Sequence, residues 1–145
     1  MRPDEPEREL LALSQAYAAA VDHRDAERLR SLFAEDGVLA VTAIGDPETV
    51  VSERSGDALA EVTERIARFD RTEHRVGRAT FAIEDHGAAT GRIEGEAHHH
   101  STTPDGPTDW VLTVEYADRY VRTDVGWRFA RRTVQVHGAE TVPGA

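Results

Sequence analysis

The stretch AATGRIEGEAHHHSTTPDGPTDWVLTVEYADRYVRT at residues 88–123 holds two long runs in which neighbouring side chains alternate in character. Alternation with a period of two is typical of a β-strand that has one face on the core. The runs cover Ala88–Thr102 and Asp109–Thr123, and the turn sequence Pro104-Asp-Gly-Pro107 separates them. We therefore predict two long antiparallel strands that are joined by a hairpin.

Further strands are predicted on both sides of this hairpin. One follows the turn Asp124-Val-Gly126 and covers Trp127–His137. Two shorter ones precede the turn Asp85-His-Gly87, and two more lie in the first half of the chain around the turn Gly45-Asp-Pro-Glu48. These four are predicted at Thr72–Val76, Ala79–Glu84, Val38–Ile44 and Val50–Arg54.

Three helices are predicted from apolar residues at helical spacing. The first covers about Pro6–His23, and its apolar face carries Leu10, Leu13, Tyr17, Ala20 and Val21. The second carries Ala26, Leu29, Leu32 and Phe33, and ends at Asp36-Gly37. The third covers Asp57–Phe69, with Asp57 as its N-cap.

Helices followed by a run of long antiparallel strands indicate an α+β fold. We expect a cone-shaped α+β barrel, in which three N-terminal helices pack on a strongly curved, mainly antiparallel sheet around an apolar pocket. At 145 residues the chain has the size of one domain. We expect that domain to span residues 1–145, with an ordered core at about 7–138 and loose ends outside it.

Composition excludes several classes of function. The formal charge of −10 opposes binding to nucleic acid or to an anionic membrane. Cysteine is absent, which excludes disulfides and thiolate metal sites, and all 17 basic residues are arginine, which excludes Schiff-base chemistry. The charged N-terminus lacks the apolar run of a signal peptide. We expect a cytoplasmic protein that needs no cofactor and binds a small apolar molecule.

Three parts of the sequence resemble the SnoaL-like polyketide-cyclase group of the nuclear-transport-factor-2-like superfamily. They are the first helix with Tyr17 and Asp22, the run RDAERLRSLFAEDG at residues 24–37, and GWRFARR at residues 126–132. The resemblance covers about Glu7 to His137 and implies the cone-shaped fold. It also implies association through the open sheet face, as a homodimer or a homotrimer.

The dehydratase branch, which includes scytalone dehydratase and bile-acid dehydratase, is most similar at the catalytic positions. There, a tyrosine and an aspartate near the end of the first helix face a histidine that follows the third helix, sometimes with a second histidine on a later strand. The resemblance places Tyr17, Asp22, His74 and His99 in these roles. An asparagine found in some pockets of the family has no counterpart, because the chain contains none.

These residue types suit proton transfer. Histidine is a natural base, and a carboxylate on its other ring nitrogen fixes the tautomer and stabilises the charged ring, so Asp22 and His74 could form one unit. Tyr17 could donate to a developing oxyanion. Simpler readings remain: Asp22 could be a solvated charge at a helix C-terminus, Tyr17 could pack in the core, and His74 could be an ordinary polar residue at a strand start.

The tract His98-His99-His100 suggests a metal site until strand geometry is considered. Neighbouring residues point to opposite faces, and His99 shares its face with Ile93 and Ala97. We therefore predict that His99 faces the pocket and that His98 and His100 are solvated, without a metal.

A largely aromatic strand face is predicted to contact the ligand or a second subunit. It consists of Trp110, Leu112, Val114, Tyr116, Asp118 and Tyr120, of which Tyr120 is expected to serve packing. The predicted substrate contacts are Trp110, Val114, Tyr116, Phe33 and Phe69. Arg131 and Arg132 are expected to pair with carboxylates.

Two main functions fit these features. The first is a cofactor-independent dehydratase, isomerase or cyclase that acts through Asp22 and His74 on a small carbonyl-containing ring of polyketide, steroid or terpenoid type. The second is a non-catalytic protein that binds a small molecule on the same fold. A purely structural subunit would instead show a filled cone and an exposed apolar patch.

Overall fold

A computed structural model of the protein describes residues 5–144. The first helix, α1, spans Glu5–Asp22 and buries its predicted apolar face, including Leu10, Leu13 and Val21. Helix α2 spans Ala26–Ser31, and the Asp25 side chain caps it by accepting from the backbone N–H of Arg28. Within the described residues, no helix is long and apolar enough to cross a membrane.

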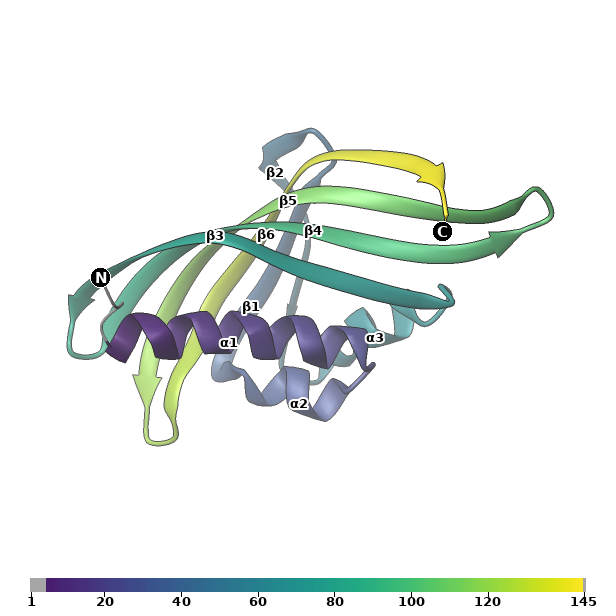
Figure 1. The fold of residues 1–145 in the computed structure, drawn as a ribbon. Helices are drawn as coiled ribbons and strands as arrows, with labels where there is room; N and C mark the ends of the chain where they lie inside the picture. The colour runs from purple at the N-terminus through teal and green to yellow at the C-terminus, as the bar shows by residue number, and fades with distance from the viewer. Residues whose placement is uncertain (1–4, 145) are drawn as a thin grey trace.

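Six strands form one sheet in the order β2-β1-β6-β5-β4-β3 (Figure 1). All neighbouring strands are antiparallel except β1 and β6, which are parallel. The strands are β1 (Phe33–Ala43), β2 (Asp46–Ser55), β3 (Arg71–Asp85), β4 (Ala88–Thr103), β5 (Gly106–Thr123) and β6 (Gly126–Pro143). The predicted hairpin of two long strands is therefore confirmed as β4 and β5.

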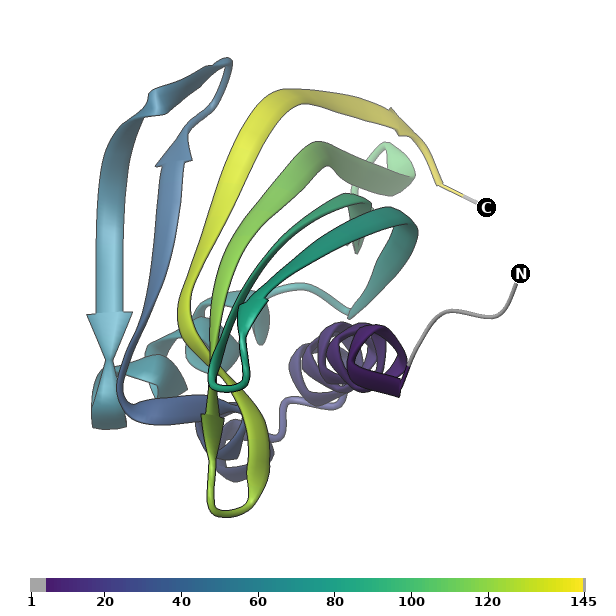
Figure 2. The same cartoon turned by 90° about the vertical axis from the view of Figure 1, so that its left-hand side faces the viewer.

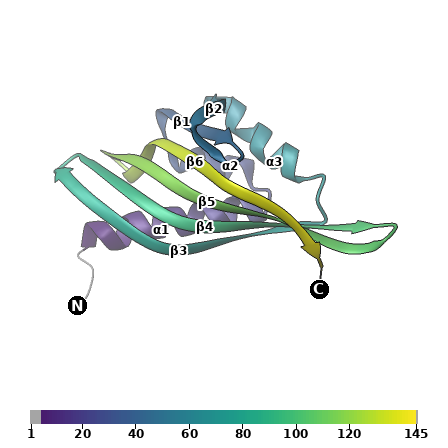
Figure 3. The same cartoon turned by 90° about the horizontal axis from the view of Figure 1, so that it is seen from above.

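The sheet bends strongly around the helices (Figure 2). Seen from above, the four long strands β3–β6 run side by side with α1 beneath them (Figure 3). Register shifts between β5 and β6, at Thr113/Val114 and Arg119/Tyr120, are β-bulges that increase local bending. The α+β class and the curved sheet are confirmed, but the sheet in residues 5–144 stays open, with β2 and β3 at its edges.

The second helix is shorter than predicted. It ends at Ser31, and Phe33 is the first residue of β1, because the backbone N–H of Phe129 in β6 donates to the carbonyl of Leu32 at 2.9 Å. Asp36 and Gly37 lie inside β1 and do not end a helix. At Gly37 the backbone passes so close to β6 that a Cβ atom would lie 2.6 Å from the carbonyl oxygen of Phe129.

The third helix also differs from the prediction. A 3₁₀ turn at Gly56–Leu59 precedes α3 (Ala60–Ile66), and Phe69 lies in the following turn. Asp57 is not an N-cap, because it lies inside the 3₁₀ turn; its carboxylate forms an ion pair with Arg30 at 2.9 Å. The short helix still reaches the core through Leu59, which is buried together with residues of α1, α2 and the sheet.

Three strand predictions are corrected. The two strands predicted at Thr72–Val76 and Ala79–Glu84 are one strand, β3, with an irregularity between them. Strand β2 begins at Asp46, so the turn before it is shorter than expected. The segment after Gly138, expected to be loose, continues β6 to Pro143, because it pairs with the start of β5 as far as Thr108.

A buried ion pair lies in the centre of the core. Arg132 of β6 donates from Nε to Oδ1 of Asp118 at 2.9 Å and from Nη2 to Oδ2 at 3.1 Å, and both side chains are almost fully buried. Nη2 also donates to the hydroxyl of Ser14 in α1. The expected pairing of Arg132 with a carboxylate is confirmed, but the burial of the pair was not predicted.

Candidate active site

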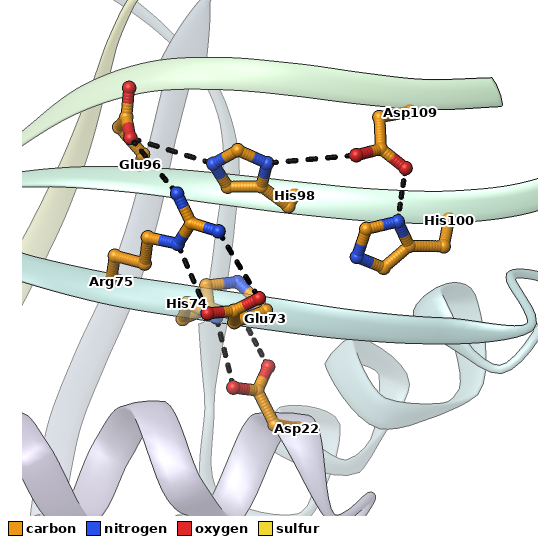
Figure 4. A network of polar contacts seen from close by, with 8 residues as sticks. All are labelled: Asp22, Glu73, His74, Arg75, Glu96, His98, His100 and Asp109. Atoms are coloured by element: carbon orange, nitrogen blue, oxygen red, sulfur yellow. Dashed lines mark hydrogen bonds and ion pairs between the residues drawn. The ribbon is translucent and has the colours of Figure 1, made fainter. Parts of the chain in front are cut away.

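Asp22 and His74 meet where the last residue of α1 reaches strand β3 (Figure 4). The Oδ1 atom of Asp22 lies 2.6 Å from Nδ1 of His74, and Oδ2 accepts from the backbone N–H of His74 at 2.9 Å. The carboxylate thus holds both the ring and the backbone of one residue. The side chain of Asp22 is 20% exposed and that of His74 is 11% exposed, so the pair is partly shielded from solvent but still open to a ligand.

The end of α1 is built to present Asp22 toward β3. Arg24 adopts a φ of 54°, a left-handed conformation that is unusual for a residue other than glycine, and the backbone N–H of Asp25 donates to the carbonyl of Ala20. This is the Schellman arrangement that ends many helices. Because glycine would adopt it without strain, the side chain of Arg24 must supply a compensating interaction.

The Arg24 guanidinium supplies that interaction by joining three segments. It donates to the carbonyl of Ile66 at the end of α3, to that of Phe69 in the following turn, to the carbonyl of Asp22, and to the hydroxyl of Thr72. Thr72 in turn donates to Oδ1 of Asp22 at 3.0 Å. Thr72 therefore supports the carboxylate directly and Arg24 supports it through Thr72, although the sequence analysis singled out neither residue.

These contacts set the charge of Asp22. Burial alone would raise the pKa of this carboxyl, but hydrogen bonds from the side chain and backbone of His74 and from Thr72 lower it below its usual value. Asp22 is consequently ionised at neutral pH. A carboxylate accepts but cannot donate, so Nδ1 of His74 carries the proton and Nε2 of the neutral ring keeps a free lone pair.

The low pKa of Asp22 predicts a specific acid response. A carboxyl whose pKa is lower in the folded than in the unfolded protein, where it is about 3.9, stabilises the fold above that pH. This stabilisation is lost as the pH falls through the folded-state pKa. We expect Asp22→Asn to be less stable than wild type at pH 7, with a difference that shrinks below about pH 4. Urea unfolding of both proteins at several pH values measures this difference in stability. A difference that does not change with pH would contradict the lowered pKa of Asp22.

His99 lies beside the pair and faces inward, as predicted. It is 5% exposed. The side chains of His98 and His100 on the opposite face are 13% and 16% exposed, so the prediction that these two residues are solvated is wrong. Nδ1 of His99 lies 3.0 Å from the carbonyl oxygen of Trp110, an acceptor, so Nδ1 carries the ring proton and Nε2 is unprotonated when the ring is neutral. Burial lowers the pKa of His99, which favours this neutral form.

Aromatic rings surround His99. Its ring centre lies 4.7 Å from that of Phe69, 5.0 Å from that of Trp110 and 6.1 Å from that of His74. The rings of Phe69 and Trp110 also stack at 6.2 Å. The structure therefore brings together Asp22, His74 and His99 with two of the five predicted substrate contacts.

The other sequence candidates lie deeper in the core. Tyr17 lies five residues before Asp22, and side chains at this spacing diverge by about 140° on a helix. Its ring packs on Tyr116 and on the guanidinium of Arg132, and burial raises the pKa of its hydroxyl. Phe33 packs on Phe129, and Val114 is buried. Substrate contact by these residues, and oxyanion binding by Tyr17, stay predictions.

A groove gives access to the Asp22–His74 pair from outside. Its volume is about 470 Å³, and its walls are α1 and the edge strand β3. The lining residues are Gln15, Ala18, Ala19, Asp22, His23, His74 and Val76. Small alanine side chains on the helix leave this space open, so a ligand can approach both members of the pair.

The outer face of the sheet carries a separate polar network behind His74 (Figure 4). It runs from Glu73 and Arg75 through Glu96 and His98 to Asp109, which also contacts His100. The described residues 5–144 contain no group of three His, Cys, Asp or Glu side chains with the geometry to hold a metal ion. The network neutralises charge across β3, β4 and β5, and it lies on the face opposite His99.

Comparison with known proteins agrees with this fold. Residues 5–133 match the family model described as the SnoaL-like domain. The chain belongs to the SnoaL-like domain family. The resemblance inferred from the sequence is thereby confirmed, and this SnoaL-like chain has many similar solved structures. No curated protein gives a significant match.

Three of these structures illustrate the range of the fold. A Novosphingobium aromaticivorans protein with a provisional assignment as scytalone dehydratase is 25% identical, with a TM-score of 0.73, over 96% of the SnoaL-like chain and 87% of its own. An aspartate-to-asparagine variant of Rv3472, a protein of unknown function from Mycobacterium tuberculosis, is 25% identical with a TM-score of 0.73. The match covers 90% of the SnoaL-like chain and 70% of the Rv3472 chain. LinA-type3, a hexachlorocyclohexane dehydrochlorinase from Novosphingobium barchaimii, is 15% identical with a TM-score of 0.77. The match covers 96% of the SnoaL-like chain and 91% of the LinA-type3 chain.

The identity of 15% to LinA-type3 shows a shared fold alone. That fold nevertheless carries an elimination reaction in the dehydrochlorinase. The SnoaL-like chain thus shares its fold with this dehydrochlorinase, and its own chemistry has to be argued from its side chains.

Proposed function

We propose that the protein is a cofactor-independent lyase or isomerase in which Asp22 and His74 transfer a proton on a small, apolar, carbonyl-containing ring. The observation that supports this most directly is the 2.6 Å contact between Oδ1 of Asp22 and Nδ1 of His74 beside an open groove. An ionised carboxylate in this position fixes the tautomer that leaves Nε2 of His74 free as a base.

The proposed reaction begins with removal of a proton from the carbon next to a carbonyl. Nε2 of His74 takes the proton, the C–H electron pair moves toward the carbonyl, and the charged ring is stabilised by Asp22. In a dehydration, the electron pair then forms a double bond as hydroxide leaves, and the proton on Nε2 passes to it to give water. In an isomerisation, the same proton returns to a different carbon.

The aromatic surroundings suit such a substrate. Phe69 and Trp110 do not line the groove at Asp22, but they stack beside His99, and aromatic faces pack well against planar rings. His99, which is neutral because of its low pKa, could accept a hydrogen bond from a hydroxyl through Nε2. We expect ring substrates of polyketide, steroid or terpenoid type to fit better than linear polar ones.

Removal of the proton next to the carbonyl can be measured even when the leaving group of the substrate is unknown. Cyclic ketones of these classes are incubated with the protein in D₂O, and deuterium incorporation next to the carbonyl is followed by NMR. We expect catalysed exchange for at least one ring class. Saturable binding without exchange for any ketone would contradict the enzyme proposal and would favour the alternative, a non-catalytic binding protein.

A further inference from the structure

A second groove lies along the first half of α1, far from Asp22. Its volume is about 310 Å³, and α1, α2 and the hairpin between β5 and β6 form its walls. Apolar side chains make up much of its surface: Ala12, Leu13, Ala16, Leu32, Val125 and Trp127. Since a helix rises 1.5 Å per residue, Ala12 lies about 15 Å along α1 from Asp22. The groove is therefore a different place from the Asp22–His74 site.

Three arginines from three elements line this groove. Arg28 comes from α2, Arg122 from β5 and Arg128 from β6. None of them forms an ion pair with a carboxylate among residues 5–144, and Glu9 is the one acidic residue in the lining. In a chain with 27 acidic residues and a net charge of −10, such a local excess of positive charge stands out.

Two of these arginines are held in place by Trp127. The guanidinium of Arg122 lies over the indole ring at 5.8 Å, and Nη1 of Arg128 donates to the Trp127 carbonyl at 2.7 Å. Trp127 is 4% exposed, and its indole N–H has no hydrogen-bond partner in the described structure. Buried donors are usually paired, so this indole N–H is an exception among the residues that the structure describes.

We propose that this groove binds an amphipathic organic anion, with its carboxylate on Arg28, Arg122 and Arg128 and a short apolar tail on the groove floor. Guanidinium groups are weakly hydrated and bind carboxylates through a planar fork of donors. The apolar floor and the exposed Val125, which is 73% accessible, would be covered by the tail. The proposal does not depend on the proposed enzymatic function.

The two tryptophans allow a direct test on the whole protein. Sodium octanoate is titrated into ¹⁵N-labelled protein, and the indole N–H signals of Trp127 and Trp110 are followed by NMR. We expect saturable shifts at Trp127 and at the side-chain signals of Arg122 and Arg128, with little change at Trp110. Octanol and octyltrimethylammonium should bind far more weakly than octanoate, and added salt should lower the affinity for octanoate.

Matched charge variants complete the test. Arg122→Gln should weaken octanoate binding about twofold to fivefold, as expected for one partly exposed ion pair. Arg119→Gln removes the same charge from the same strand outside the groove and should have no effect. Equal loss in both variants, equal binding of octanol, or shifts at Trp110 in place of Trp127 would each overturn the proposal.

Discussion

Replacing Asp118 with asparagine is expected to lower the free energy of unfolding by about 3–5 kcal/mol. The substitution keeps the shape of the side chain but leaves the charge of Arg132 without its counterion in the core. Arg132 is 0% exposed, so water cannot replace the lost carboxylate. Two hydrogen bonds at 2.9 and 3.1 Å are weakened at the same time, and so is the one that Tyr120 donates to Asp118 at 2.7 Å.

Urea denaturation at pH 7 measures this loss. The control is Glu115→Gln on the same strand, where the contacts with Arg92 and His137 are partly exposed and the ion pair with Arg92 should contribute at most about 1 kcal/mol. Replacing both members of the buried pair, as Asp118→Leu with Arg132→Met, should recover part of the stability because no charge is then buried alone. A loss for Asp118→Asn no greater than that of the control would refute this account.

The burial of Arg132 could not be predicted from the sequence. Trp127 and Phe129 of β6 are buried, so strict alternation would place Arg131 in the core and Arg132 outside. The register shift at Arg119/Tyr120 leaves Ala130 as an extra residue in β6, which reverses the alternation and turns Arg132 inward. Nothing local in the sequence marks this bulge, because alanine suits either face.

Other features could be predicted from the sequence because they depend on a local pattern of residues. The inward direction of His99 followed from alternation along β4, which is regular between Gly91 and His100. Helix α1 followed from apolar spacing and ends within one residue of the predicted end. The contact between Asp22 and His74 joins residues 52 positions apart, and only the family resemblance predicted it. Arg24 went unnoticed because its role depends on a left-handed backbone and on acceptors distant in sequence.

His74→Gln is expected to reduce the rate of the proposed proton exchange by about 10²–10⁴-fold, the usual contribution of a positioned general base. Glutamine preserves a polar side chain of similar reach but has no nitrogen that can take a proton near neutral pH. Asp22→Asn should cause a smaller loss, on the order of 10²-fold, because His74 keeps its base but loses the negative charge that stabilises the protonated ring. The measurement is deuterium incorporation in the ketone that wild type exchanges fastest.

The matched control is His98→Gln, which removes a histidine from the same part of the sheet but from the outer face. It should exchange at the wild-type rate, since His98 contacts Glu96 and Asp109 and not the Asp22–His74 pair. Urea unfolding of all three variants separates lost chemistry from lost fold. A folded His74→Gln protein with wild-type exchange would exclude His74 as the base and direct attention to Nε2 of His99, the other unprotonated ring nitrogen in the cluster.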